Sequence, residues 1–487
     1  QVEVDVSQGL PGLTIVGLAD KAVAESRERI RSALKNTGFS FPLSRITVHL
    51  APSDYKKSGL HFDLPIALGI LLADKQLKRT ANFDSTLFIG GISLDGALQP
   101  IHGTLVLVEW AKQNGLTAVV LPVANLNEAK LIKGICLVGA EDFNQVIDWL
   151  SGKFAGIDFA DETFANIDNL DIDWLQIQGQ ERAKRAAVVA ASGGHNILLE
   201  GPPGAGKTLL ARGLRALLPK LEGDELIDVV KIHSVAGTLK PRQRIDTISR
   251  PFRSPHHTAS SIAIVGGGTV PRPGEISLSH RGVLFLDELP EFPRSVLEAL
   301  RQPLEDGEIH VSRANQAVSF PARFQLVATM NPCPCGWLDS GVKECICSPF
   351  QINAYRKRVS GPIIDRIDLY LRVPPIKIIE MQKEPNDSNE LASLRSIISQ
   401  TRAIQYRRNN KRLNHELKSG EIRSKINIGS EAEKLLQQAA EKFVITGRGY
   451  HRLLKVSRTI ADLAQVRQVT PTHVAEALQY RFSESSR

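Results

Sequence analysis

Cysteine, methionine and long apolar stretches are scarce in this chain. Its 487 residues include five cysteines and two methionines, and five cysteines are too few for a disulfide-rich secreted scaffold. No apolar run approaches the roughly 18 residues that a membrane-spanning helix needs. The first residues alternate between charged and apolar, which is not the pattern of a secretory signal. We therefore expect a cytoplasmic protein with no membrane partner, and because the chain opens on Gln1 we expect a short native N-terminus before it.

The charge of the chain is moderate but unevenly placed. The net charge is +8, with 23% charged and 42% hydrophobic residues, as in ordinary globular proteins. Residues 151–175 are acidic, whereas residues 401–425 carry eight basic residues against Glu416 and Glu421. The acidic stretch predicts an interdomain linker. The basic stretch, which includes Tyr406, suits either a nucleic-acid backbone or a solvated helical surface.

The pattern of apolar residues predicts an α/β protein of several domains. Short apolar runs of strand length alternate with helical spacing over residues 1–150, and a second α/β unit follows the acidic stretch. After about residue 375 the pattern becomes wholly helical, as expected for a small lid. The predicted parts are an N-terminal α/β domain at 1–150, a linker at 151–173, a core at 174–375 and a lid at 376–487.

A glycine-rich loop between a strand and a helix carries the clearest chemistry. The strand at 196–200 leads directly into G-x-x-x-x-G-K-T, and a helix runs from 208 to 218. Glycines let backbone N–H groups surround phosphate oxygens, and the helix N-terminus favours negative charge. Lys207 is expected to reach the β- and γ-phosphates of ATP and Thr208 to ligate Mg²⁺. The predicted cofactor-binding residues of this loop are Gly201, Gly204, Gly206, Lys207 and Thr208.

Two carboxylates end the buried strand at 282–286. A buried strand should not end in paired acids without a role, because burying charge is costly. We expect Asp287 to hold Mg²⁺ and Glu288 to activate the attacking water. Together with the glycine loop, this pair predicts ATP hydrolysis.

Three further residues have the positions of catalytic groups in AAA+ enzymes. Asn331 ends the strand at 324–329, where a sensor would orient the water. Arg366 lies where an arginine could reach the γ-phosphate of a neighbouring subunit, although a local pair with Asp365 or Asp368 is the alternative. Arg448 opens a lid helix and is the candidate γ-phosphate sensor; Arg452 and Arg458 in the same helix are rivals.

With those residues named, the chain resembles the magnesium-chelatase-like AAA+ family, and within it a bacterial competence-protein group. The resemblance covers nearly the whole chain. It implies a hexameric helicase that acts on single-stranded and branched DNA, and that migrates branches when incoming DNA recombines during natural transformation, with recombination proteins as further partners. The motifs that carry it are Gly179-Gln-Glu181, His195-Asn196, Arg253-Ser-Pro-His-His-Thr-Ala-Ser260, Pro273-Gly-Glu275, Gly282-Val-Leu-Phe-Leu-Asp-Glu-Leu-Pro-Glu291, Asn331-Pro-Cys-Pro-Cys-Gly336 and Ser360 to Asp368.

The same resemblance implies two inserted hairpins that project into the pore of a ring. The first fits residues 256–280 and the second residues 307–323. Arg272 and Arg313 are the candidates for contacts with DNA phosphates, which position a motor without reading sequence. An intersubunit salt bridge is the alternative for Arg313.

Residues 84–125 contain Gly90-Gly-Ile-Ser-Leu-Asp-Gly-Ala-Leu-Gln-Pro100, Ala111-Lys-Gln-Asn-Gly115 and Val119-Val-Leu-Pro122. On these residues the N-terminal domain resembles the proteolytic domain of Lon, with its ribosomal-S5-domain-2-like α/β fold. That protease family uses a serine nucleophile and a lysine base. Here the lysine position falls near Leu107 and the serine position near Leu60, so Ser58 has no base beside it and is not activated. We expect the fold to be retained and proteolysis to be lost, with Lys56 and Lys57 as candidate DNA contacts.

Four of the five cysteines lie within 15 residues of one another. Two thiolate pairs supply the ligand number of a closed structural Zn²⁺ site, although C-x-C is tighter than the usual spacing and reduced thiols without metal are the alternative. The candidate ligands are Cys333, Cys335, Cys345 and Cys347.

The sequence therefore predicts an ATP- and Mg²⁺-dependent DNA-translocating ring, most simply a homohexamer. Two other functions stay open. One is the motor subunit of a magnesium chelatase, and the other is a protein-remodelling ATPase whose N-terminal domain binds clients.

Overall fold

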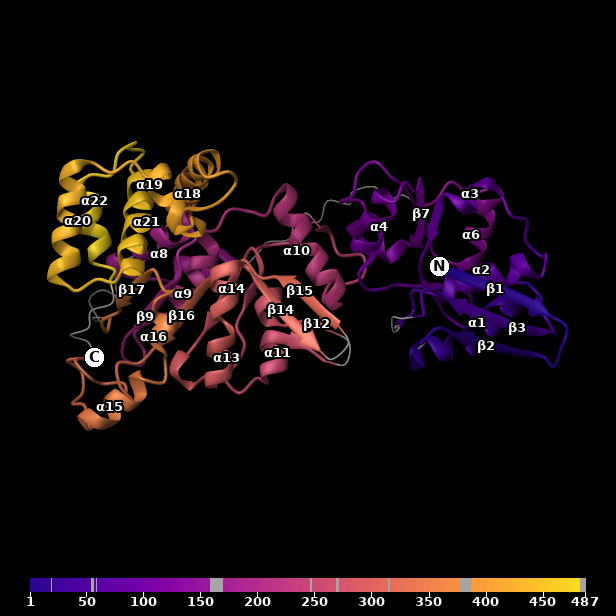
Figure 1. Cartoon of the computed structure of the whole chain (residues 1–487), viewed down its shortest axis with the longest axis horizontal. Helices are drawn as coiled ribbons and strands as arrows, with labels where there is room; N and C mark the ends of the chain where they lie inside the picture. The colour runs from indigo at the N-terminus through magenta and orange to yellow at the C-terminus, as the bar shows by residue number, and fades with distance from the viewer. Residues whose placement is uncertain are drawn as a thin grey trace. The chain divides into compact units, whose positions relative to one another are not determined.

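The computed structural model describes residues 1–18, 20–53, 57, 59–157, 170–245, 248–268, 271–313, 316–376 and 387–481 (Figure 1). The chain divides into two compact units. The N-terminal unit comprises Gln1–Ala165 with Leu226–Ile248, and the C-terminal unit comprises Asn166–Glu225 with Ser249–Arg487. Most of the predicted acidic linker, at 158–169, lies outside the described residues.

The N-terminal unit is built from small sheets and the helices that cover them. In the first sheet β3 lies between β1, its antiparallel neighbour, and β2, its parallel neighbour; β4, β7 and β8 form a parallel sheet, and β5 pairs with β6. Its strands are β1 (Val2–Ser7), β2 (Gly12–Val16), β3 (Arg45–Leu50), β4 (Thr86–Phe88), β5 (Gly91–Ile92), β6 (Leu98–Gln99), β7 (Ala118–Pro122) and β8 (Cys136–Ala140). Its helices are α1 (Lys21–Asn36), α2 (Asp63–Ala73), α3 (Ala81–Asp84), α4 (Thr104–Gln113), η1 (Val123–Asn125), α5 (Leu126–Ala129) and α6 (Phe143–Leu150).

A segment from the middle of the chain completes the N-terminal unit. Helix α10 (Gly223–Ala236) begins in the C-terminal unit, and its later turns belong to the N-terminal one. Val230 and Ile245 are buried in the same cluster as Leu105 and Val108. The predicted core at 174–375 was continuous and so included residues 226–248, which the structure places in the N-terminal unit. Apolar spacing does not reveal which sheet a helix will cover.

The C-terminal unit contains a five-stranded parallel sheet in the order β10-β13-β16-β9-β17. Ile197 and Leu199 of β9 join the hydrophobic cluster on one face, and Leu198 joins the cluster on the other. Because both faces are covered, every residue of a central strand is buried, which explains the continuous apolar runs in the sequence. The strands are β9 (Ile197–Glu200), β10 (Phe252–Arg253), β13 (Val283–Leu286), β16 (Gln325–Met330) and β17 (Leu369–Arg372).

Helices and two insertions surround this sheet. Both inserted hairpins expected from the sequence are present: β11 pairs with β12, and β14 pairs with β15. The insertions consist of α11 (Ser261–Val265), β11 (Gly266–Gly267), β12 (Arg272–Pro273) and α12 (Glu275–Leu278), and of β14 (Glu308–Arg313) and β15 (Gln316–Pro321). The helices are α7 (Leu170–Leu175), α8 (Glu181–Gly193), α9 (Lys207–Leu217), η3 (Leu289–Glu291), α13 (Arg294–Ala299), α14 (Arg301–Asp306), α15 (Pro349–Arg356) and α16 (Gly361–Ile364).

The lid is helical, as the sequence predicts, and its helices α18 and α21 pack on α8 (Figure 1). No helix among the described residues has the length and apolarity to cross a membrane. The lid elements are α18 (Ser388–Arg408), η4 (Asn414–Glu416), α19 (Ser419–Lys425), α20 (Ser430–Lys442), α21 (Gly447–Leu463) and α22 (Pro471–Leu478).

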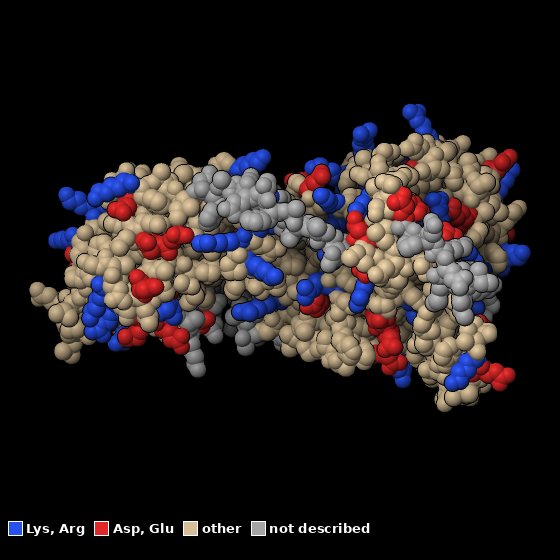
Figure 2. Space-filling view, turned by 180° about the vertical axis from the view of Figure 1, so that it is seen from behind, with Lys and Arg blue, Asp and Glu red and all other residues tan. Residues whose placement is uncertain are grey.

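The basic stretch at 401–425 is partly buried and partly paired with acidic side chains. Arg402 is buried, Arg408 binds Asp462 at 2.6 Å, and Arg412 binds Glu421 at 2.6 Å. On the face drawn in Figure 2, basic and acidic side chains are interspersed. Acidic side chains therefore pair with Arg408 and Arg412, and Arg402 donates to a backbone carbonyl, whereas Arg407 and Arg423 are exposed.

Candidate nucleotide site

The glycine-rich loop joins β9 to α9, and its glycines are sterically required. A Cβ on Gly201 would lie 2.3 Å from the carbonyl oxygen of Val373. Gly204 and Gly206 have φ angles of +76° and +78°, in the left-handed region that favours glycine. Helix α9 starts at Lys207 immediately after Gly206. The result is a short loop at a helix N-terminus, which is a binding site for phosphate.

Lys207 lies at the centre of the site. Its ammonium group donates to the carbonyl oxygens of Gly201 and Pro202 at 2.6 and 3.0 Å, and to the side-chain oxygen of Asn331 at 3.1 Å. Burial lowers the pKa of Lys207, and the charges of Asp287 and Glu288 oppose that shift. The structure thus brings the predicted phosphate ligand and the predicted sensor into direct contact.

The two carboxylates lie at the carboxyl end of β13, as predicted. Asp287 accepts a hydrogen bond from Thr208 at 3.3 Å and another from Thr329. Glu288 is exposed and its φ is +54°, so the backbone turns sharply at this residue. The Glu288 N–H donates to the Thr329 hydroxyl at 3.0 Å. The sequence analysis missed Thr329, which positions both acids from the neighbouring strand.

This arrangement fits a magnesium-bound nucleotide. The hydroxyl of Thr208 and a carboxylate oxygen of Asp287 are hard oxygen donors side by side, which is the ligand chemistry of Mg²⁺. When bound, Mg²⁺ would neutralise charge on the phosphates. Gln180, also outside the prediction, donates to the carbonyl of Ala205 at 2.7 Å and braces the loop from the residue before α8.

Arg366 and Arg448 meet at a single acid that the sequence analysis did not identify. Arg366 binds Glu305 of α14 at 2.7 Å, and Arg448 lies 3.6 Å from the same carboxylate. Arg366 also donates to the carbonyls of Arg301 and Pro362, and its side chain is 8% exposed. The local partner of Arg366 is therefore Glu305, and neither Asp365 nor Asp368 takes that place.

The two rival sensor arginines have structural partners. Arg458 is 2% exposed and binds Asp462 at 2.8 Å. Arg452 donates to the carbonyls of Ile364 and Ile367. Arg448, whose side chain is 63% exposed, is therefore the remaining candidate for the γ-phosphate sensor.

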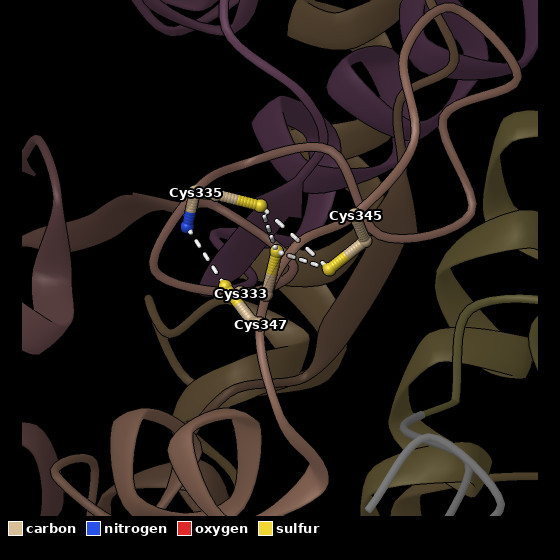
Figure 3. A group of neighbouring side chains, drawn as sticks. All are labelled: Cys333, Cys335, Cys345 and Cys347. Carbon is tan, nitrogen blue, oxygen red and sulfur yellow. Dashed lines mark hydrogen bonds between the residues drawn. The ribbon is translucent and has the colours of Figure 1, made fainter.

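The four clustered cysteines converge in the loop after β16 (Figure 3). Their sulfurs all lie within 4.8 Å of one another, and none is in a disulfide. The Sγ of Cys333 lies 3.4 Å from that of Cys335 and 3.6 Å from that of Cys345. Four sulfurs each about 2.3 Å from a tetrahedral Zn²⁺ would be about 3.8 Å apart. The donor set and its spacing therefore fit zinc.

The cysteine loop also packs on the phosphate loop. Gly336 has a φ of +83°, and a Cβ there would lie 2.7 Å from Cδ of Pro203. Arg356 of α15 donates to the carbonyl of Pro332 beside the cysteines. The cysteine loop thus lies directly against the phosphate loop.

The four predicted DNA contacts have different outcomes. Arg272 is exposed on β12, and Arg313 ends β14 opposite Gln316, but its side chain is not among those described. Lys56 lies outside the described residues. The prediction for Lys57 was wrong: its side chain is buried and its ammonium group donates to the carbonyl of Pro52, so it does not face DNA.

The Lon-like positions carry no catalytic pair among the described residues. Leu107 lies on α4 and Leu60 precedes α2, whereas Ser58 is not described. The polar cluster of this unit lies elsewhere and is buried. Asp63 accepts hydrogen bonds from Arg29 and Ser26, and all of these groups are already paired.

The parallel sheet, the glycine loop, the paired acids and the lid define an ATPase of the AAA+ class. Three family descriptions match the chain: "Subunit ChlI of Mg-chelatase" at residues 2–125, "Magnesium chelatase, subunit ChlI" at 173–381, and "Magnesium chelatase, subunit ChlI C-terminal" at 388–481. The chain belongs to the magnesium-chelatase-like AAA+ family, in the group that contains ComM and YifB.

Two of its relatives cover nearly its whole length. It is 43% identical to the competence protein ComM of Haemophilus influenzae, over 99% of this chain and 94% of that protein. It is also 43% identical to the protein YifB of Escherichia coli, over 99% and 93%. The similarity to the magnesium-chelatase 38 kDa subunit of Cereibacter sphaeroides is 29%, over 32% of this chain and 51% of that subunit. The chain is thus an AAA+ ATPase that uses ATP and Mg²⁺.

Proposed function

We propose that the protein is an ATP-driven DNA translocase that assembles as a ring, most simply a homohexamer, and moves DNA branches when incoming strands recombine during natural transformation. The competence relative, similar over nearly its full length, supports the biological setting. AAA+ ATPases commonly oligomerise, which supports the ring.

One observation carries the mechanism: Arg366 and Arg448 meet at Glu305, and neither binds the phosphate loop of its own chain among the described residues. Two arginines gathered at one acid form a compact positive site for the γ-phosphate held by an adjoining copy. An arginine supplied in this way stabilises the charge that develops as the phosphoryl group transfers. Arg366 must leave Glu305 to act, so assembly and hydrolysis are coupled.

Within one protomer the remaining roles follow from the contacts. Lys207 binds the phosphates, Thr208 and Asp287 supply oxygen ligands for Mg²⁺, and Glu288 takes the proton of the attacking water. Asn331 contacts Lys207 and orients that water. The exposed Arg272 of the first hairpin, and Arg313 at the end of β14 in the second, are the proposed phosphate contacts to DNA.

The cysteine cluster is proposed as a structural zinc site. Bound Zn²⁺ would cross-link the loop that packs on Pro203 and so hold it against the phosphate loop. Metal analysis of the purified protein beside a Cys345→Ser, Cys347→Ser double variant tests it. We expect close to one zinc per chain in the parent and none in the variant; equal zinc in both would end the proposal.

A second candidate function is the motor subunit of a magnesium chelatase, because the family descriptions name that enzyme. The low coverage of the chelatase subunit itself argues against it. Capture of a porphyrin-binding partner by the purified protein would favour this candidate.

The deciding experiment compares ATP hydrolysis with no DNA and with single-stranded, duplex and branched DNA, using Glu288→Gln as the hydrolysis-deficient control. We expect branched or single-stranded DNA to stimulate the parent and not the control. If no DNA raises the rate, the translocase proposal fails. Stimulation by unfolded protein instead would support a remodelling ATPase.

A further inference from the structure

A cavity lies at the amino ends of the strands of the parallel sheet, whereas the phosphate loop lies at their carboxyl ends. It is lined by Gly194, Gly282 and Gln325, which stand at the amino ends of β9, β13 and β16. The phosphate loop leaves the carboxyl end of β9. The cavity, of about 50 Å³, is therefore separated from the nucleotide site by the length of the strands.

The charge around this cavity is strongly positive. Three of its arginines, Arg250, Arg281 and Arg323, come from the core, and Arg402 comes from the lid helix α18. Within the part of the chain that the structure describes, two carboxylates line the cavity with them, so the four arginines leave an excess of two positive charges.

The two acids, Glu225 and Glu416, already contact three of the four arginines. Glu225 binds Arg250 at 2.6 Å, lies 3.9 Å from Arg281, and accepts a hydrogen bond from the hydroxyl of Tyr406. Glu416 lies 3.9 Å from Arg323. These contacts neutralise part of the positive charge, but neither carboxylate forms an ion pair with Arg402.

Arg402 is the least compensated of the four. It is buried, and its Nε and Nη2 both donate to the carbonyl oxygen of Ala191, at 2.9 and 2.6 Å. Among the described residues no carboxylate forms an ion pair with it and none accepts from its Nη1. Burial and the nearby charge of Arg250 lower the pKa of Arg402 to about 10, so it stays charged at neutral pH. A buried charge without a partner is costly and therefore marks a place for a counter-charge.

We propose that this cavity binds a single phosphate group, as orthophosphate or as the terminal phosphate of a nucleic-acid strand. A phosphate dianion matches the excess of two positive charges, and arginine is well suited to its oxygens. The cavity exceeds the ~10–15 Å³ that one water needs, but it is far below the roughly 300 Å³ of the smaller pockets for organic ligands. A whole nucleotide does not fit.

Occupancy would join the lid to the core. Arg402 belongs to the lid, whereas Arg250 lies just before β10, and its carbonyl accepts a hydrogen bond from Arg215 at 3.1 Å. Arg215 is in the last turn of α9, the helix that begins at the phosphate loop. A phosphate group in the cavity would hold the lid helix α18 against the far end of that same helix.

The test measures equilibrium binding of radiolabelled orthophosphate to the full-length Lys207→Ala protein, in which the phosphate loop is weakened. The site variant adds Arg323→Gln, chosen because that side chain is 47% exposed and the fold should tolerate the change. The matched control adds Arg407→Gln, an exposed arginine of the same helix as Arg402. Circular dichroism verifies that both variants are folded.

We expect phosphate to bind the Lys207→Ala protein and its Arg407→Gln derivative alike, and the Arg323→Gln derivative about tenfold more weakly, as for loss of a hydrogen bond to a charged group. Absence of binding in the Lys207→Ala protein, or equal binding in both derivatives, would overturn the proposal. Competition by an oligonucleotide with a terminal phosphate, and not by the same strand with a terminal hydroxyl, identifies nucleic acid as the source; no competition by either identifies free phosphate. These binding measurements do not require DNA translocation, so this proposal can fail or hold independently of the proposed function.

Discussion

Asp63 in the N-terminal unit and Asp287 in the C-terminal unit are both carboxylates among apolar elements, yet their partners differ. Asp63 is fully buried and has a permanent cation, because Arg29 donates to both of its oxygens. Asp287 is partly exposed and, among the described residues, forms no ion pair; the side-chain groups that donate to it are the hydroxyls of Thr208 and Thr329.

The comparison separates a structural acid from the acid that we propose as a metal ligand. A carboxylate already neutralised by arginine has little to offer a metal ion, whereas one held only by hydroxyls keeps its charge for a cation that arrives with the substrate.

The largest expected effect is at Arg366, which we propose acts at the Asp287 site of a neighbouring copy. Arg366→Ala should lower ATP turnover by roughly 10³–10⁵-fold, as for loss of an arginine that stabilises phosphoryl transfer. Mixing Arg366→Ala protein with Lys207→Ala protein should restore part of the activity, because mixed rings contain some complete sites. Arg407→Ala serves as the control. Full activity of Arg366→Ala alone, or no recovery on mixing, would contradict action between subunits.

Asp287→Asn tests the ligand-binding acid. We expect slower ATP hydrolysis, because the variant loses several kcal/mol of transition-state stabilisation when the carboxylate no longer binds Mg²⁺. The midpoint of thermal unfolding should stay near that of the parent. Steady-state kinetics over a range of Mg²⁺ concentrations measures the change. A variant that hydrolyses ATP normally at low Mg²⁺ would remove Asp287 from the metal site.

Asp63→Asn tests the structural acid and should have the opposite signature. Removing one partner of a buried pair leaves Arg29 without a counter-charge and should cost about 3–5 kcal/mol of local stability. Amide hydrogen exchange in α1 and α2 reports that cost, with Asp5→Asn on the exposed side of β1 as the control. Loss of exchange protection in the phosphate loop instead would mean that the two units are not independent in this respect.

The smallest effect concerns acid stability. Burial alone would raise the pKa of Asp368, but its hydrogen bond and ion pair with His195 lower it to about 2 from 3.8. Because the pKa of Asp368 is lower in the folded state than in the unfolded chain, its ionisation stabilises the folded state at pH values above the unfolded pKa. This contribution is lost as the pH falls from about 4 to 2. The shift corresponds to about 2 kcal/mol at neutral pH. Urea unfolding of Asp368→Asn should show this deficit at neutral pH and almost none near pH 2; a deficit that does not depend on pH would exclude the ion pair as its cause.

Much of the nucleotide site could be predicted because its residues are neighbours in sequence. The loop from Gly201 to Thr208 and the pair Asp287–Glu288 depend on a strand end and a helix start, which local chain geometry sets. The helical lid was predicted from local apolar spacing, whereas both hairpins were expected from the resemblance to the family. Lys57 was wrongly assigned because basic character alone does not tell whether a side chain is buried.

The amino-acid sequence by itself determined the glycine loop and the paired acids, since each depends on residue types at short spacing, and it determined the family through motifs spread along nearly the whole chain. Only the tertiary structure decided that Glu305 joins Arg366 to Arg448, that Thr329 braces Asp287, that residues 226–248 belong to the N-terminal unit, and that four arginines surround one cavity. The physical reason is that these contacts join residues from separate elements, and packing of those elements sets such distances, which no local spacing encodes.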